Sequence, residues 1–304
     1  MSTRTLLNLG LALLAVALVL VVVYQPGLEP DTAPRPIVTG LDPETVASIS
    51  VTRPAHGPIT LTRHDNHWYL FSGKQELPAA EFQVRALLRL LQATSTVEYP
   101  AASVDPAALG LQPPQATLDI DGTQIVFGTT DPLEDRRYVQ VADRVYLIED
   151  QYQHLLSAEY WSFIDRRLLA EGSSIIGLEL PDMALHYSDA DGWRVAPDAG
   201  TAGADELRQL VANWETATAL YISADDGAAT DESVHIQLRD RESALEFRVV
   251  SRTPGLILAR PDWGIRYHLT GDLADGLFAL PVTEAEPDTG QELEPEQDMP
   301  LEME

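Results

Sequence analysis

Residues 84–91 read VRALLRLL, and residues 207–214 read LRQLVANW. Each stretch carries apolar side chains at its first, fourth, fifth and eighth positions, the spacing that places four side chains on one face of an α-helix. The apolar positions recur at a constant offset of 123 residues, and so does the arginine at the second position (207 − 84 = 123). The two stretches therefore predict two amphipathic helices in equivalent places of a tandem repeat.

Segments with the alternation of half-buried β-strands surround each helix. A pair of strand-like segments and a tryptophan, Trp68 or Trp193, precede the helix, which we expect to begin at Pro78 in the first half. Four more strand-like segments follow each helix: 117–120, 124–127, 137–141 and 144–148 in the first half, and 233–238, 245–250, 256–259 and 265–269 in the second. The predicted fold class is α+β, with two tandem repeats of antiparallel sheet that are each covered by a helix.

A long apolar run lies N-terminal to the repeats. Residues 6–24 read LLNLGLALLAVALVLVVVY, and a helix of this length, at ~1.5 Å per residue, crosses the hydrocarbon core of a bilayer. No pair of small residues follows at a cleavable spacing, so we expect an uncleaved transmembrane signal anchor rather than a buried core helix. The predicted membrane-anchor residues include Leu6, Leu11, Leu14, Val19 and Val22. Membrane lipid is therefore the first expected partner.

The charges around the apolar run predict its orientation. Arg4 precedes it, whereas Glu29 and Asp31 follow it, which places the N-terminus in the cytoplasm and the main domain outside. The expected organisation is therefore a cytoplasmic N-terminus (1–5), the anchor (6–24), a Pro-rich linker (25–40), two repeats (41–170 and 171–282) and a disordered acidic tail (283–304).

The composition excludes several functions. A formal net charge of −27 opposes binding to nucleic acid, which requires a basic surface. The absence of cysteine excludes disulfides, a thiolate nucleophile, iron–sulfur clusters and cysteine zinc sites.

Residues that could carry chemistry do not form a known catalytic pattern. His64 and His67 flank a predicted turn, and no third metal ligand follows at a suitable spacing. There is no Gly-x-Ser-x-Gly elbow, and the segment at 128–131 lacks the glycine spacing and lysine of a phosphate-binding loop. Acidic residues near Arg136 and Arg137 could form an acid–base cluster, although a charged hairpin loop is the simpler interpretation; they are Asp131, Glu134 and Asp135. We expect no catalytic residue, no metal and no cofactor.

Three aromatic residues stand beside two arginines between the repeats, in the segment 160–167. Aromatic residues and arginine are enriched at protein interfaces, so this segment is a candidate partner-docking site. The alternative is a structural connection between the repeats. The candidate residues are Trp161, Phe163, Arg166 and Arg167.

Several short segments are similar to those of a known family. They are LGLQPP (109–114) before ATL (116–118), Tyr138-Val139, VYLI (145–148) and DRRLL (165–169). Together with a single N-terminal anchor, these segments resemble the bacterial DUF4340 family over about residues 40 to 280. The Gly-Leu-x-Pro element occurs only in the first half, and a loop at 225–231 takes its place in the second.

The resemblance implies a single-pass protein of the bacterial inner membrane with a periplasmic domain. Its members are often encoded beside ABC-type export components related to the gliding-motility auxiliary system. We therefore expect a non-enzymatic accessory subunit of such an assembly, which acts by protein–protein interaction, with an ABC-type permease or a related membrane subunit as partner. The alternative is a binding module for an envelope ligand, a glycan or a lipid, in a cleft between the repeats that Trp161 or Trp263 would line. A hydrolase ranks third.

Overall fold

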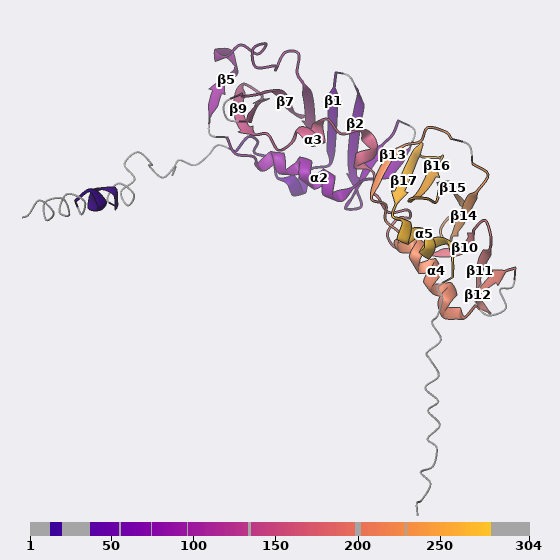
Figure 1. The fold of residues 1–304 in the computed structure, drawn as a ribbon. Coiled ribbons are helices and arrows are strands. Elements are labelled where there is room, and N and C mark those ends of the chain that lie inside the picture. The colour runs from indigo at the N-terminus through magenta and orange to yellow at the C-terminus, as the bar shows by residue number, and fades with distance from the viewer. Residues whose placement is uncertain are drawn as a thin grey trace, which may run out of the picture. The chain divides into compact units, whose positions relative to one another are not determined.

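The structure is a computed structural model that describes residues 13–19, 37–54, 56–73, 75–95, 97–132, 135–197, 202–228 and 230–280. Its strands form two mostly antiparallel sheets, accompanied by few helices (Figure 1). The chain divides into two compact units, of which the first comprises 1–46, 52–56 and 88–152, and the second comprises 47–51, 57–87 and 153–304.

The first sheet has nine strands in the order β4-β3-β2-β1-β6-β7-β8-β9-β5. Alternation of apolar and polar residues buries one face of these strands, and β1, for example, buries Ile49 and Val51. The bounds are β1 Ser48–Arg53, β2 His56–His64, β3 His67–Phe71, β4 Glu76–Pro78, β5 Glu98–Pro100, β6 Ala116–Ile120, β7 Thr123–Thr130, β8 Arg136–Val141 and β9 Arg144–Glu149.

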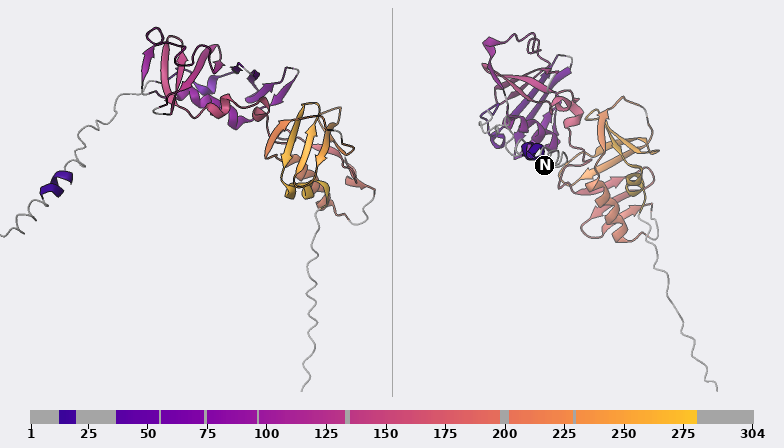
Figure 2. Two further views of the ribbon diagram at one scale, coloured as in Figure 1. Left: turned by 45° about the horizontal axis from the view of Figure 1, so that its top comes forward. Right: turned by 60° about the vertical axis from the view of Figure 1, so that its left-hand side comes forward.

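The second sheet has eight strands in the order β12-β11-β10-β14-β15-β16-β17-β13. Figure 2 shows several of them as orange and yellow arrows. The bounds are β10 Ile175–Glu179, β11 Ala184–Ser188, β12 Gly192–Ala196, β13 Tyr221–Ala224, β14 Ser233–Leu238, β15 Leu245–Ser251, β16 Leu256–Arg260 and β17 Ile265–Leu269.

The two sheets share one topology. When β4 is set aside, the order of the first sheet becomes that of the second, with β1 matching β10, β9 matching β17 and β5 matching β13. Tyr146 is the third residue of β9, and Tyr267 is the third residue of β17. Each lies opposite a residue of the corresponding edge strand, Glu98 or Ile222. The shared strand order agrees with the tandem repeat that the two helical stripes predict.

The helical stripes are buried as predicted. α2 (Glu81–Leu88) continues into the 3₁₀ turn η2 (Arg89–Gln92), and α4 spans Ala204–Thr216. The eight stripe residues are buried: Val84, Leu87, Leu88, Leu91, Leu207, Leu210, Val211 and Trp214. α4 packs against β10, β12 and α5 (Gly271–Phe278), with α4 and α5 side by side (Figure 1). The remaining helical elements are η1 Pro43–Thr45, η3 Ala101–Ser103, α3 Gln153–Leu156 and η4 Tyr160–Phe163.

The predicted start of the first helix is wrong. Pro78 does not begin a helix but ends β4, where it lies opposite Tyr69. A proline is tolerated there because β4 is the last strand of the sheet, and beyond it only an isolated bridge between Ala79 and Ile164 continues the pairing. The helix begins at Glu81, whose carboxylate accepts a hydrogen bond from the Trp68 amide at 3.2 Å.

The N-terminal run is described only in part. Residues 13–19 are helical, with Leu14 61% exposed and Val19 60% exposed. Within the ranges that the structure describes, no helix is both long and apolar enough to cross a membrane. Three of the predicted anchor residues (Leu6, Leu11 and Val22) and the acidic tail (283–304) lie outside those ranges, so the anchor and the tail stay predictions.

Candidate functional site

The segment 163–169 pairs with other parts of the second unit on both of its sides. Ile164 forms an isolated antiparallel bridge with Ala79, and Arg167 forms one with Thr218. Four backbone hydrogen bonds flank these bridges: Ala80 N to Phe163 O (2.7 Å), Asp165 N to Pro78 O (2.9 Å), Leu168 N to Ala217 O (3.0 Å) and Ala219 N to Arg166 O (2.8 Å). The segment therefore connects the end of β4 and the residues just after it to the chain before β13.

The four candidate docking residues occupy different environments. Trp161 is partly exposed, and its ring meets Tyr160 edge to face with centroids 5.1 Å apart. Arg166 is exposed, and its Nη1 donates to the Leu220 carbonyl at 2.8 Å. Phe163 is 0% exposed, so it is a core residue rather than part of a docking surface.

Arg167 is held by two carboxylates, one within the segment 163–169 and one just after it. Its Nη2 lies 2.7 Å from Asp165 Oδ2, and its Nη1 lies 2.7 Å from Glu171 Oε2. These hydrogen bonds raise the pKa of Arg167, and the bond to Arg167 lowers the pKa of Glu171. The charge of Arg167 is thus balanced by carboxylates that are close in sequence.

An exposed apolar surface adjoins Arg166. Leu220 is 57% exposed and Tyr221 is 55% exposed, and η4 packs beside β13, which begins at Tyr221. We call Trp161, Arg166, Leu220 and Tyr221 the docking patch. The sequence reasoning missed Leu220 and Tyr221 because the pattern of a strand does not reveal that it lies at a sheet edge.

Arg167 lines two adjoining hollows, with volumes of about 290 and 390 Å³. They share Tyr69, Pro78, Asp165, Arg167 and Ala170, and all their lining residues belong to the second unit. Trp263 lines the smaller hollow, whereas Trp161 lines neither.

The smaller hollow contains a buried arginine, and we call it the Arg260 cleft. The side chain of Arg260 is 4% exposed, and its Cζ lies 3.4 Å from the centroid of the Trp263 ring. Its hydrogen bonds are long: 3.2 Å from Nε to Asp262 Oδ1, 3.5 Å from Nη2 to Asp262 Oδ2, and 3.4 Å from Nη1 to Leu168 O. Charge-assisted bonds of this kind usually measure about 2.7–2.9 Å, so the guanidinium is incompletely satisfied.

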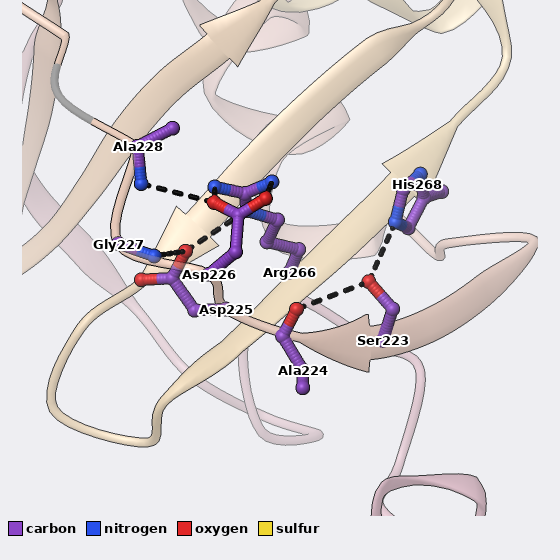
Figure 3. A network of polar contacts seen from close by, with 8 residues as sticks. All are labelled: Ser223, Ala224, Asp225, Asp226, Gly227, Ala228, Arg266 and His268. Carbon is purple, nitrogen blue, oxygen red and sulfur yellow. Dashed lines mark hydrogen bonds and ion pairs between the residues drawn. The ribbon is translucent and has the colours of Figure 1, made fainter.

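Figure 3 shows a polar network at the loop that follows β13. Arg266 donates from Nε to Asp225 Oδ1 at 2.8 Å and from Nη1 to Asp226 Oδ2 at 2.8 Å. The Ala228 amide, followed by Arg266, lowers the pKa of Asp226. This loop stands where the first half has its Gly-Leu-x-Pro element, and the ion pairs of Arg266 fix its first two residues.

A serine and a histidine lie close together in the same view. Ser223 Oγ is 2.9 Å from His268 Nε2 (Figure 3). Burial, followed by the charge of Arg266, lowers the pKa of His268. The two residues come from the paired strands β13 and β17, the His268 ring stacks on Tyr221 at 4.2 Å, and neither residue lines the hollows. The pairing of β13 with β17 is sufficient to explain the contact between Ser223 and His268, so the contact needs no catalytic explanation.

The other candidate residues have structural partners. The His64 ring stacks on Tyr69 with centroids 4.0 Å apart, and its Nε2 lies 3.1 Å from Glu76 Oε2. Arg137 points inward to Asp150 rather than joining the charged loop, in which Glu134 lies outside the described residues. Across the described part of the chain, no group of three or more histidine or acidic side chains is placed to hold a metal ion.

Comparison with known proteins identifies one family. A family model described as a domain of unknown function, DUF4340, matches residues 68–224, slightly more than half of the 304 residues. Comparisons with curated proteins and with solved structures find no match.

Proposed function

The chain belongs to the DUF4340 family, and on this premise we propose that it is a non-enzymatic, extracytoplasmic accessory subunit of an ABC-type membrane assembly. The proposed activity is protein–protein interaction through the docking patch. A related membrane subunit or the permease itself is the proposed partner, in keeping with the assembly to which the family resemblance points.

The observation that carries this proposal is the composition of the docking patch. Trp161, Arg166 and Tyr221 belong to the residue types that dominate the energy of protein interfaces. Leu220 and Tyr221 each leave more than half of their surface exposed, and exposed apolar side chains that adjoin one another favour a protein contact. The backbone bridges of 163–169 hold Arg166 in place, which reduces the loss of conformational freedom on binding.

Membrane attachment by residues 6–24 is part of the same proposal. The apolar run would hold the domain at the outer face of the inner membrane, where a permease is within reach. A fusion of alkaline phosphatase after Gly40 tests the orientation, because the enzyme is active only outside the cytoplasm. We expect an active fusion, and an inactive one would contradict the proposed topology.

Co-purification from native membranes tests the proposed interaction. We expect the tagged full-length protein, extracted in mild detergent, to recover an ABC-type permease or a related membrane subunit in stoichiometric amount. The Leu220→Ala/Tyr221→Ala double variant should lose this partner. Tyr99→Ala is the matched control, since Tyr99 is also an exposed tyrosine on an edge strand (40% exposed, in β5). Equal recovery with both variants would contradict the role of the docking patch.

A second candidate function is supported by the Arg260 cleft. A cleft lined by Trp161 or Trp263 is the feature that would favour an envelope ligand, a glycan or a lipid, over a protein partner. Trp263 lines the Arg260 cleft, whose volume of about 290 Å³ is close to the lower limit of small-molecule sites. We therefore propose ligand binding as the alternative activity, at a site separate from the docking patch.

A further inference from the structure

Two buried arginines of this chain differ sharply in how well they are hydrogen-bonded. Arg137 is 3% exposed and makes four bonds of 2.7–2.8 Å, to Asp150, Gln115 Oε1 and the Gly128 carbonyl. Arg260 is also 3% exposed, but its three bonds measure 3.2–3.5 Å. A guanidinium has five N–H donors, and the other two of Arg260 have no acceptor among the described residues. Arg260 is therefore a buried cation that can still bind a planar anion.

The surroundings of Arg260 show a second unused polar group. The Tyr267 hydroxyl is buried and has no hydrogen-bond partner in the described structure. It is close enough to Arg260 for the guanidinium to oppose the rise in the pKa of Tyr267 that burial causes. Leaving a buried donor unpaired is unfavourable, so the Tyr267 hydroxyl and the Arg260 guanidinium are both weakly held by their neighbours.

Two of the acids that line the cleft already have a basic partner. Glu76 lies 3.1 Å from His64 Nε2, and Asp165 lies 2.7 Å from Arg167 Nη2. At the exposed rim, neither Asp240 nor Arg241 has an ion-pair partner among the described residues. The cleft thus combines one incompletely bonded guanidinium with acids that would repel a doubly charged anion more strongly than a singly charged one.

The rest of the lining is apolar. Tyr69, Leu238, Leu245 and Trp263 contribute to the walls of the cleft. The volume of about 290 Å³ admits a ligand of modest size. A guanidinium fork matches the two oxygens of a carboxylate, and apolar walls match a hydrocarbon body.

We propose that the Arg260 cleft binds a small monocarboxylate with an apolar body, and that its carboxylate accepts hydrogen bonds from the Arg260 guanidinium. The hydrocarbon part lies against Leu238 and Leu245, and Arg241 adds a second positive charge at the rim. This inference rests on the second candidate function, ligand binding, and is independent of the docking patch.

Titration calorimetry on the full chain in lipid nanodiscs tests the chemistry of the ligand. Three probes share one hydrocarbon body and differ in the head group: hexanoate, hexanamide and hexylamine. We expect hexanoate to bind at least tenfold more tightly than the other two. Equal binding of hexanoate and hexanamide would overturn the carboxylate assignment. If none of the three binds, the carboxylate assignment and the ligand-binding function both fail, whereas partner docking is decided separately by the Leu220→Ala/Tyr221→Ala variant.

Substitutions test the role of Arg260 in binding hexanoate. Arg260→Lys keeps the charge but removes the fork, and we expect at least a tenfold loss of hexanoate affinity. Arg252→Lys is the matched control and should bind hexanoate as the parent does, because Arg252 also stacks on an aromatic ring (Phe278, 4.1 Å) and pairs with an acid (Glu232, 2.8 Å) outside the cleft. A folded Arg260→Lys protein with unchanged affinity would overturn the proposal. If Arg260→Lys does not fold, as judged by circular dichroism, the probe series on the parent protein decides, and Arg241→Gln should still weaken hexanoate binding two- to fivefold.

Discussion

Arg137 and Asp150 form a bidentate ion pair inside the first unit, with 2.8 Å from Nε to Oδ1 and 2.7 Å from Nη2 to Oδ2. The side chains of the pair are only 4% and 11% exposed. Thr130 Oγ1 also donates to Asp150 at 2.7 Å, so β7, β8 and the end of β9 are tied together by one carboxylate. Substitutions in this pair should therefore change the stability of the fold rather than the binding of a partner or ligand.

Removal of one partner of this pair should destabilise the protein strongly. Arg137→Ala leaves the Asp150 carboxylate buried without its cation, and loss of one member of a buried pair costs about 3–5 kcal/mol. Chemical denaturation of the full chain measures the change in the free energy of unfolding. The control is Arg144→Ala, since Arg144 is 46% exposed and pairs with Glu98 at the surface; it should cost less than about 1 kcal/mol. Equal effects would contradict the assigned role.

The Asp150 carboxylate predicts that the stability of the fold depends on pH. Burial raises the pKa of Asp150, but hydrogen bonds from Arg137 and Thr130 outweigh this effect and leave the pKa lowered. A carboxyl group whose pKa is lower in the folded state stabilises the fold above its unfolded pKa of about 3.9 and loses that contribution as the pH falls through the folded pKa. We expect the unfolding free energy to decline below about pH 4. Asp150→Asn should flatten this decline in denaturation series at successive pH values, and an unchanged decline would argue against Asp150 as its source.

Gly128 should not accept a side chain. A Cβ at this position would collide with the backbone carbonyl of Leu109, and that carbonyl already accepts a hydrogen bond from the Thr129 amide at 2.8 Å. We expect Gly128→Ala to lower the unfolding free energy by about 1–3 kcal/mol, as overpacking does. Gly57→Ala is the matched control because a Cβ there meets nothing within 4 Å, and it should change stability by less than about 0.5 kcal/mol. A Gly128→Ala protein as stable as the control would show that the Leu109 loop can move away.

Trp214 should stabilise the fold through its ring nitrogen as well as through its buried ring. Its Nε1 donates to the Leu277 carbonyl at 2.8 Å, and both residues are 0% exposed. Trp214→Phe keeps an aromatic ring but leaves the buried carbonyl unpaired, at a cost of about 1–3 kcal/mol. Thermal unfolding should show the lower stability, and the partly exposed Trp193→Phe serves as the control. Equal stability of the two variants would mean that α5 shifts to satisfy its own carbonyl.

The sequence predicted those parts of the fold in which local patterns and burial agree. The stripes 84–91 and 207–214 were sufficient to place α2 and α4, because an i, i+3, i+4, i+7 pattern has one buried face whatever lies opposite. Pro78 misled the prediction because proline suits both the first turn of a helix and an edge strand, and only the pairing with Tyr69 decides between them.

The candidate sites were less accessible to sequence reasoning. The Arg260 cleft brings together Tyr69, Arg167, Arg241 and Arg260, which are far apart along the chain, and no local pattern relates them. Trp263 was named as a possible cleft residue and does line it, whereas Trp161 does not. Phe163 was chosen with its aromatic neighbours, but composition alone cannot distinguish a buried ring from an exposed one.

The repeated strand order has an evolutionary consequence. A chain that carries the same topology twice can use one copy for stability while the other accumulates changes at its surface. The fully bonded Arg137 lies in the first sheet and the incompletely bonded Arg260 in the second, so the two copies place a buried arginine under different constraints. Variation among relatives should then be distributed unevenly between the two sheets.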